Sequence, residues 1–174
     1  YGVMGYESCG VHIANGPIAV WRCSGQTLQK THELACSHNS FTHVHTSESE
    51  HEVGLSLDEY GLRPVEWLDH IGVLSQNTQL VHSVWVKENE IELLADSSAS
   101  VIHCPVSNAV LGSGTAPVAA MLDRGVAVLL GTDGPASNDT QDTWETLKAA
   151  VSLARITGLD RSEEHTSELQ SLLI

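Results

Sequence analysis

The segment THVHTSE carries three side chains whose types and spacing could do chemistry: His43, His45 and Glu48. Side chains at positions i and i+2 of a strand share one face, so both imidazoles can face the same point if this segment is a strand. Imidazole nitrogens are common ligands of zinc and iron. A catalytic metal site usually needs at least three protein ligands and an open position, so further ligands must come from elsewhere in the chain.

Three more polar side chains follow apolar, strand-like runs. His82 ends TQLVH, His103 ends SVIH, and Asp133 ends VAVLLGTD. Each has an ordinary alternative explanation, because a single buried histidine is more often structural and GTDG is a common turn sequence. Their recurrence at the ends of successive strands favours one shared site.

Strand-like and helix-like stretches alternate from about residue 17 onward. Ser24 is the expected N-cap of the first helix, and Gly125 is expected to end a later one. The last strand is apolar enough that we expect it to be buried on both faces. A short apolar run at residues 17–21 precedes predicted strands at residues 41–46, 78–86, 100–106 and 126–133, and predicted helices at residues 24–39, 63–74, 87–99, 116–125 and 143–158.

This alternation indicates βα units around a parallel sheet, which is an α/β fold. A barrel and an open, doubly wound sheet would both fit the pattern. An open sheet binds its ligand at one switch point and typically carries a glycine-rich phosphate turn, but no GxGxxG or Walker A sequence follows a strand here. Four strands that each end on a polar group favour a barrel, whose sites collect residues from many strand ends.

The composition of the chain argues against some classes of binding partner. The 174 residues carry a formal net charge of −14, which argues against binding to nucleic-acid backbones or to anionic lipid. We find no apolar run long enough to span a membrane and no signal peptide in YGVMGYESCG. The four cysteines form no CxxC pair, so we expect reduced thiols in a cytoplasmic protein with a small-molecule substrate.

Four segments together resemble the amidohydrolase superfamily, in particular its deaminase and chlorohydrolase branch, which includes guanine, 8-oxoguanine and cytosine deaminases and triazine hydrolases. These segments are HVHTSE, LVHSVWV, HCPVSNAVLGSG and LLGTDGPASND. The resemblance implies a metal-dependent (β/α)₈ TIM barrel. Residues 17–158 would be its C-terminal part, from about the fourth or fifth strand to the eighth.

The resemblance also implies roles for individual residues. His45 would bind the metal at the end of the fifth strand, and Glu48 would contact the substrate and act as acid and base. His82 would orient the attacking water and contribute to the metal site. Asp133 would bind the metal and accept a proton from the water, and Asn108 would shape the substrate pocket.

His103 is a further candidate for substrate binding, whereas His43 is interpreted as a packed neighbour. His82 comes only 37 residues after His45, so HVH is interpreted as the fifth-strand motif and not as the HxH pair of the family's first strand. That first-strand pair is absent from this sequence. Histidine and carboxylate ligands suit zinc, with iron as the alternative.

The expected reaction is hydrolysis of a C–N bond outside peptides, by deamination of a purine, pyrimidine or triazine-like ring. Hydrolytic dechlorination, cyclic-amide hydrolysis and a catalytically inactive truncated half-barrel stay open as alternatives. The expected partner is a small heterocycle, and the parent protein is a candidate homo-oligomer. As a fragment, the chain is expected to be inactive alone.

The two ends of the sequence stand apart from this pattern. Residues 1–16 match nothing that we can place. Residues 159–174 contain RSEEHTSELQS, which resembles the translation of a common sequencing adapter, although an acidic capped helix is the ordinary alternative. We therefore expect this tail to be an artefact that packs poorly on the domain.

Overall fold

The protein is built around a four-stranded parallel sheet. The computed structural model describes residues 13–157. The strands lie in the order β1-β2-β3-β4, each hydrogen-bonded to the next. Their bounds are β1 (Thr42–Thr46), β2 (Thr78–His82), β3 (Ser100–His103) and β4 (Ala127–Leu130). The predicted α/β class with a parallel sheet is therefore confirmed.

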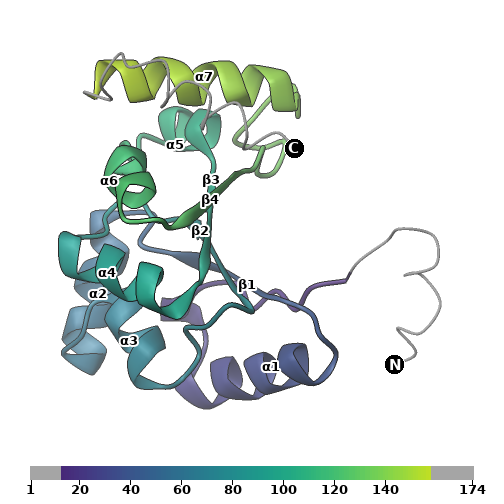
Figure 1. Ribbon diagram of the computed structural model, residues 1–174, viewed down its shortest axis with the longest axis vertical. Coiled ribbons are helices and arrows are strands. Elements are labelled where there is room, and N and C mark those ends of the chain that lie inside the picture. Colours follow the sequence, from purple (N-terminus) through teal and green to yellow (C-terminus); the bar gives the residue numbers. More distant parts are fainter. Residues whose placement is uncertain (1–12, 158–174) are drawn as a thin grey trace.

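Seven α-helices and one short 3-10 helix connect or flank these strands within residues 13–157. Figure 1 shows α2, α3, α4 and α6 along one side of the strands, with α1 below and α7 above. Their bounds are η2 (Val20–Arg22), α1 (Gly25–Ser37), α2 (Glu50–Tyr60), α3 (Pro64–His70), α4 (Glu88–Ser97), α5 (Pro105–Leu111), α6 (Val118–Asp123) and α7 (Thr143–Ile156).

One row of side chains across the sheet forms the centre of the core. Val44, Leu80, Val101 and Val128 occupy equivalent positions in the register of neighbouring strands. All four are fully buried and belong to one apolar cluster with residues of the helices. Burying each such side chain contributes roughly 1.5–3 kcal/mol to stability, so this row fixes which face of the sheet meets the helices.

Strand β4 departs from the prediction that it would be buried on both faces. Only Val128 is buried, whereas Ala127 is exposed and Leu129 is 39% exposed. The reason is position, because β4 lies at an edge of the sheet and only its Val128 face packs on helices. An apolar sequence alone does not say which strand lies at an edge.

Several predicted boundaries were too generous, and two helices were missed. β2 ends at His82 and β3 at His103, where the sequence suggested longer strands. Pro105 begins α5, since proline lacks an N–H and is well placed in a first helical turn. Helix α2 was missed although Ser49 caps it and acidic residues fill its first turn.

Two predicted helix ends are confirmed. The Ser24 side chain accepts a hydrogen bond from the Thr27 N–H at 3.2 Å, as an N-cap does. Gly125 follows α6 with φ of +76°, a left-handed conformation that glycine adopts without steric cost. The predictions for residues 1–12 and for 158–174, which include the tail, lie outside the described residues, and the predicted domain boundaries stay predictions.

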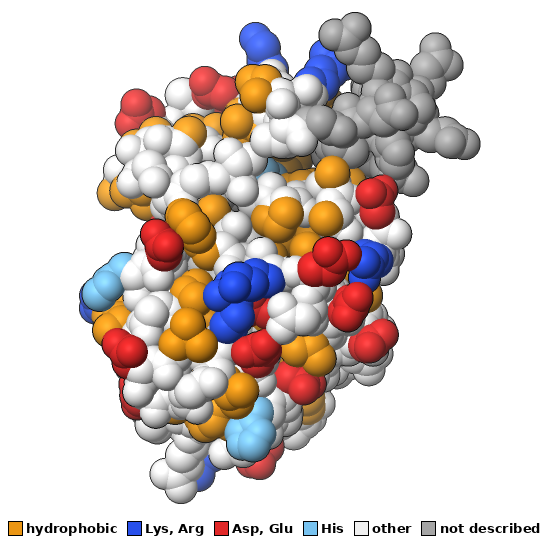
Figure 2. Space-filling view, turned by 90° about the vertical axis from the view of Figure 1, so that its left-hand side faces the viewer, with side chains coloured by type: hydrophobic (Ala, Val, Ile, Leu, Met, Phe, Trp, Pro, Cys, Tyr) orange, Lys and Arg blue, Asp and Glu red, His pale blue; other side chains and the backbone are white. Residues whose placement is uncertain are grey.

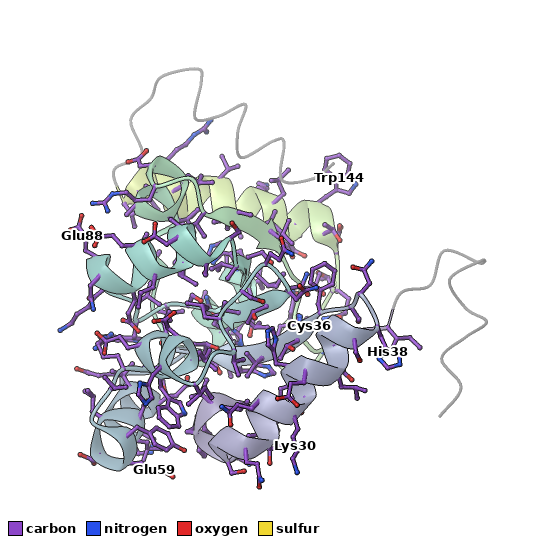
Figure 3. All side chains as sticks on the ribbon, turned by 60° about the horizontal axis from the view of Figure 1, so that its bottom comes forward. Lys30, Cys36, His38, Glu59, Glu88 and Trp144 are labelled. Atoms are coloured by element: carbon purple, nitrogen blue, oxygen red, sulfur yellow. The ribbon has the colours of Figure 1, made fainter. Side chains whose placement is uncertain are left out.

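The surface is polar and mixed in charge. On the side that carries α2, α3, α4 and α6, basic side chains lie next to acidic ones with apolar patches between them (Figure 2). Arg124 is one such group, because its guanidinium pairs with Glu88 and Glu92. Trp144 at the start of α7 is 73% exposed and projects outward (Figure 3). Between residues 13 and 157, no helix is long and apolar enough to cross a membrane.

Candidate functional site

Every predicted site residue except Asn108 lies at or just after the carboxyl end of a strand, and parallel strands bring those ends to one edge. We call this edge the carboxyl rim and define it as residues 45–52, 82–85, 103–108 and 131–137. The rim holds all the candidates named from the sequence. It also holds Ser47, Glu52, Ser107 and Ser137, which the sequence analysis did not single out.

His45 and His82 come together because the backbone of His82 is unusual. In the register of β1 and β2, His45 pairs with Val81 and Thr46 pairs with His82. Regular alternation would therefore put the two histidines on opposite faces of the sheet. His82 instead has φ of +73°, which ends the strand, and its ring lies 5.3 Å from that of His45 at an interplanar angle of 29°.

Both imidazoles have their Nδ1 atoms engaged. The Nδ1 of His45 is bonded to the carbonyl oxygen of Ile18, which can only accept. The Nδ1 of His82 lies 2.8 Å from the side-chain oxygen Oδ1 of Asn108. Each Nδ1 therefore donates, and in the neutral ring each Nε2 keeps its lone pair. Histidines that bind metals are commonly oriented in this way.

Glu48 lies beside the histidine pair. Its Oε2 is 3.7 Å from the Nε2 of His82, and its Oε1 is 3.4 Å from the Ser113 hydroxyl. The Glu48 side chain is 28% exposed, so the carboxylate can meet a ligand. Its backbone N–H donates to the Oε2 of Glu52 at 2.7 Å, which fixes the turn that presents it.

Glu52 was not recognised in the sequence. Burial raises the pKa of this carboxyl group and outweighs the backbone hydrogen bonds from Glu48 and Ser47 that lower it. The available signal was the spacing of Ser49 and Glu52, an S-x-x-E pattern typical of helix N-termini. Ser49 indeed accepts from the Glu52 N–H at 3.3 Å.

Asp133 is held by two hydroxyl groups. Its Oδ2 accepts from the Ser107 hydroxyl at 2.6 Å and from the Ser137 hydroxyl at 2.9 Å. Burial alone would raise the pKa of Asp133, but these hydroxyls, the Gly134 backbone and His82 together hold it below its usual range. Asp133 is therefore a carboxylate at neutral pH, with Oδ1 free of these two bonds.

The first residue of the GTDG sequence, Gly131, lies where the structure has no room for a side chain. A Cβ at this position would lie 2.7 Å from the Ile102 side chain and 3.0 Å from the Cys104 sulfur, closer than packed atoms come. Asp133 itself has φ of +60°. Gly131 lets the chain pass close to β3, and the left-handed backbone of Asp133 then directs its side chain toward the carboxyl rim.

His103 is a buried histidine of the rim. Its strand position matches that of Val101, so it shares the face that packs on helices, and it is 3% exposed. Desolvation by burial lowers the pKa of His103 to about 4, with a smaller contribution from His82, so the ring is neutral at pH 7. Its Nδ1 has no hydrogen-bond partner among residues 13–157.

The rim concentrates features that cost stability. In the described part of the chain, four of the seven non-glycine residues with positive φ lie there: Ser47, His82, Ser83 and Asp133. So do five of the six buried side-chain polar atoms without a partner in the same residues: Ser47 Oγ, Glu52 Oε1, Ser83 Oγ, His103 Nδ1 and Asn108 Nδ2. Strained backbone and unsatisfied polar groups each cost about 1–3 kcal/mol, which the rest of the fold must offset. Both are found clustered at functional sites.

The donor chemistry of the rim fits a divalent metal in part. His45 and His82 each offer a nitrogen whose ring partner is already bonded, and Asp133 offers a carboxylate oxygen, Oδ1, outside its two hydroxyl bonds. Among residues 13–157, however, no three His, Cys, Asp or Glu side chains are close enough to hold an ion by themselves. These residues can supply part of a metal site, and the remaining ligands must come from elsewhere.

Comparison with known proteins gives one consistent result. The sequence model described as "Amidohydrolase family" matches residues 4–172. A curated 5'-deoxyadenosine deaminase from Methanothermobacter thermautotrophicus is 42% identical over 146 residues, which are 84% of this chain and 34% of that protein. The chain therefore spans about a third of the length of the curated relatives it matches.

Two solved structures show the same arrangement of elements. An adenosine deaminase from Xanthomonas campestris with bound zinc superposes with a TM-score of 0.80 at 35% identity, covering 84% of this chain and 35% of that one. An atrazine chlorohydrolase from Arthrobacter aurescens, complexed with zinc, gives a TM-score of 0.74 at 30% identity, covering 78% and 30%.

Proposed function

Because this chain belongs to the amidohydrolase family, we propose that it forms part of a metal-dependent hydrolase that removes ammonia from the adenine ring of an adenosine-like nucleoside. One observation carries the proposal. The rings of His45 and His82 lie 5.3 Å apart at the carboxyl rim, each with its Nδ1 engaged, and Glu48 is 3.7 Å from His82.

Family membership confirms the resemblance found in the sequence, including its deaminase and chlorohydrolase branch. The fold is that of part of a metal-dependent (β/α)₈ barrel, as the sequence predicted. Since the chain spans about a third of its relatives, the activity belongs to a longer protein, and this part supplies some of its site.

His45, His82 and Asp133 are the residues that would hold the metal. Zinc is the proposed ion, supported by the two zinc-containing neighbours and by the imidazole and carboxylate donors, with iron as the alternative. A divalent metal in such a site lowers the pKa of bound water to about 7 and so makes a nucleophile available at neutral pH.

The roles of the protein groups follow from their surroundings. Asp133 is ionised and can accept the proton that the attacking water loses. Glu48 is partly exposed beside His82 and can deliver a proton to a ring nitrogen and then to the departing amine. His82 is fixed by Asn108 and can orient the water. Water adds to the ring carbon, the C–N bond breaks, and ammonia leaves with the transferred protons.

The substrate side is less directly supported. Its class is proposed from relatives whose names specify 5'-deoxyadenosine, 5-methylthioadenosine and S-adenosylhomocysteine. His103 and Asn108 stay predicted substrate-binding residues, although both are buried and the Asn108 oxygen is bonded to His82. The net charge of −14 supports a small molecule as the partner and not nucleic acid or a membrane. A homo-oligomer and a cytoplasmic location stay predictions.

Hydrolytic dechlorination of a triazine is the second candidate. It is supported by the atrazine chlorohydrolase neighbour at 30% identity. The same groups would serve, with chloride leaving the ring in place of ammonia. The higher identity to adenosine-type deaminases, 42% against 30%, favours deamination.

The test is product release by the full-length protein that contains this sequence. We expect ammonia from adenosine-like nucleosides, loss of turnover on treatment with a chelator, and recovery on adding zinc. The substrates to be tested also include aminopyrimidines and an aminotriazine, with ammonia measured, and a chlorotriazine, with chloride measured.

His45→Ala should lower kcat/KM by about 10³ or more, because a metal ligand is lost. His43→Ala is the matched control, since His43 lies on the same strand but is bonded to Gln79 at 3.2 Å. Turnover that resists the chelator, or equal losses in the two variants, would contradict the proposal.

A further inference from the structure

We propose that residues 105–113, which comprise α5 and the turn that ends it, are a positioning element that holds three groups of the site: Asp133, His82 and Glu48. We call this stretch the α5 segment. The inference rests on the proposed function, because those three groups are the ones assigned to the reaction. It goes beyond that assignment by giving the CPVSNAVLGSG sequence a physical task.

The first contact comes from Ser107. Its side chain is fully buried, and its hydroxyl donates to the Oδ2 of Asp133 at 2.6 Å. The Ser137 hydroxyl donates to the same oxygen at 2.9 Å. Both hydroxyls bind the same oxygen, so they hold the carboxylate by Oδ2 and leave Oδ1 outside these two bonds.

The second contact comes from the next residue. Asn108 is 1% exposed, and its Oδ1 accepts from the Nδ1 of His82 at 2.8 Å. An amide oxygen can only accept, so this contact fixes the His82 tautomer with the proton on Nδ1 and the lone pair on Nε2. It also holds the ring near His45, where the left-handed backbone of His82 has already turned it.

The third contact comes from the turn after the helix. Ser113 places its hydroxyl 3.4 Å from the Oε1 of Glu48, and its carbonyl accepts from the Trp85 indole N–H at 2.8 Å. Gly114 has φ of +116°, which other residues rarely adopt, and a Cβ there would lie only 3.1 Å from the Val84 side chain. The turn is therefore packed against the loop that follows β2. His82 is the last residue of that strand, directly before the loop.

The local structure of the α5 segment explains how nine residues can reach three groups. Successive residues in a helix point about 100° apart, so from one turn Ser107 and Asn108 reach residues that follow β4 and end β2, the strands on either side of β3. The helix ends with Gly112 at φ of +68°, and the Ser113 N–H donates to the Asn108 carbonyl at 2.9 Å. This Schellman geometry ties the position of Ser113 to that of Asn108.

The consequence is that groups from three different strands share one rigid support. Asp133 follows β4, His82 ends β2, and Glu48 follows β1, whereas α5 itself follows β3. Support of this kind around a metal site typically changes metal affinity or activity by 10–100-fold when it is removed. Ser107, Asn108 and Ser113 are thus positioning residues and act through the groups they contact.

The experiment uses the full-length protein and three readouts. The first is the ¹⁵N NMR tautomer of His82 in metal-free protein, at a pH where the ring is neutral. The second is zinc affinity, by competition with a chromophoric chelator. The third is the separate effect on kcat and on KM. The variants are Ser107→Ala, Asn108→Ala and Asn108→Asp, and Val110→Ala on the exposed side of α5 is the control.

We expect Ser107→Ala and Asn108→Ala each to weaken zinc binding about tenfold and to lower kcat with little change in KM. Asn108→Ala should also release His82 toward the tautomer protonated on Nε2. Asn108→Asp keeps an acceptor, so it should keep the Nδ1–H tautomer. Val110→Ala should leave all three readouts unchanged.

Several results would overturn the proposal. One is an Nε2–H tautomer of His82 in the unaltered protein, because Asn108 would then donate and not accept. Others are unchanged zinc affinity in both alanine variants, or a rise in KM alone, which would assign Asn108 to the substrate.

If an alanine variant fails to fold, Ser107→Cys and Asn108→Asp take its place in the same three measurements. Both conserve the size of the side chain and change the strength of its hydrogen bond. If no nucleoside or triazine is turned over but the tautomer and zinc results hold, the positioning role stands and the proposed reaction falls.

Discussion

Two buried histidines lie at opposite ends of the same parallel sheet and differ in whether their Nδ1 atom has a hydrogen-bond partner. His32 lies near the amino ends of the strands, where its Nδ1 meets Thr42 at 3.1 Å and its Nε2 meets Ser75 at 3.2 Å. His103 lies at the carboxyl rim, where its Nδ1 has no partner within residues 13–157. Burial lowers the pKa of both rings.

The surroundings of the two histidines differ in the same way. We call His32, residues 40–42 and residues 75–78 the amino rim. There Thr78 bonds to Val73, and Asn77 bonds to the Ser40 carbonyl at 2.9 Å, so the buried polar groups are paired. The carboxyl rim instead combines left-handed residues with unpaired polar atoms. The amino rim is built for stability, and the carboxyl rim gives up stability to keep groups available.

The largest effect should come from Asp133 at the carboxyl rim. We expect Asp133→Ala in the full-length protein to lower kcat/KM by about 10³ or more, because the reaction loses a metal ligand and a proton acceptor. Ammonia release over a range of substrate concentrations measures this. Asp139→Ala is the control, since Asp139 is exposed in the same loop. A loss below tenfold would remove Asp133 from the site.

The second prediction concerns acid stability. The pKa of His103 is 6.5 when unfolded and about 4 when folded, so the unfolded state binds more protons between these values. Stability is therefore complete above about pH 6.5 and falls as the pH drops toward 4, by about 3 kcal/mol in all. Urea unfolding at stepped pH should show this loss.

His103→Gln should flatten the acid limb, whereas His51→Gln, at an exposed position, should not. Measurements between pH 6.5 and 4.5 avoid the carboxylate of Asp133, whose lowered pKa affects stability only in more acidic solution. An unchanged acid limb in His103→Gln would show that His103 is not buried in its neutral form.

The third prediction tests the amino rim. His32→Ala should lower the free energy of unfolding by roughly 2–3 kcal/mol, because it leaves a cavity and deprives Thr42 and Ser75 of partners. The kcat per folded molecule should stay the same. A lower kcat with unchanged stability would reverse the assignment of the two rims.

The smallest effect should come from Cys36, at the exposed edge of the amino rim (Figure 3). Its sulfur is 3.5 Å from the Nε2 of His32, which Ser75 also contacts. Cys36→Ser should therefore change the free energy of unfolding by less than about 0.5 kcal/mol. Thermal melting checks this, and a shift of several degrees would show that the sulfur contributes to the pairing of His32.

Sequence reasoning found the parts of this protein that depend on local patterns. The apolar strand that precedes Asp133 and the helix capped by Ser24 each follow from residues within one element. His45, His82 and Asp133 were placed at strand ends for the same reason. Helices α2 and α5 were missed because their apolar periodicity is weak, although Ser49 and Pro105 marked where they begin.

The sequence by itself determined the order of the four strands and their alternation with helices, the net charge, and the residue types at the strand ends, because each can be read along the chain. Only the tertiary structure decided that His82 faces His45, since a left-handed residue reverses the alternation that the sequence implies. It also decided that Ser107 and Asn108 hold Asp133 and His82. Those contacts join residues 26 positions apart, and their partners are fixed by the packing of separate βα units.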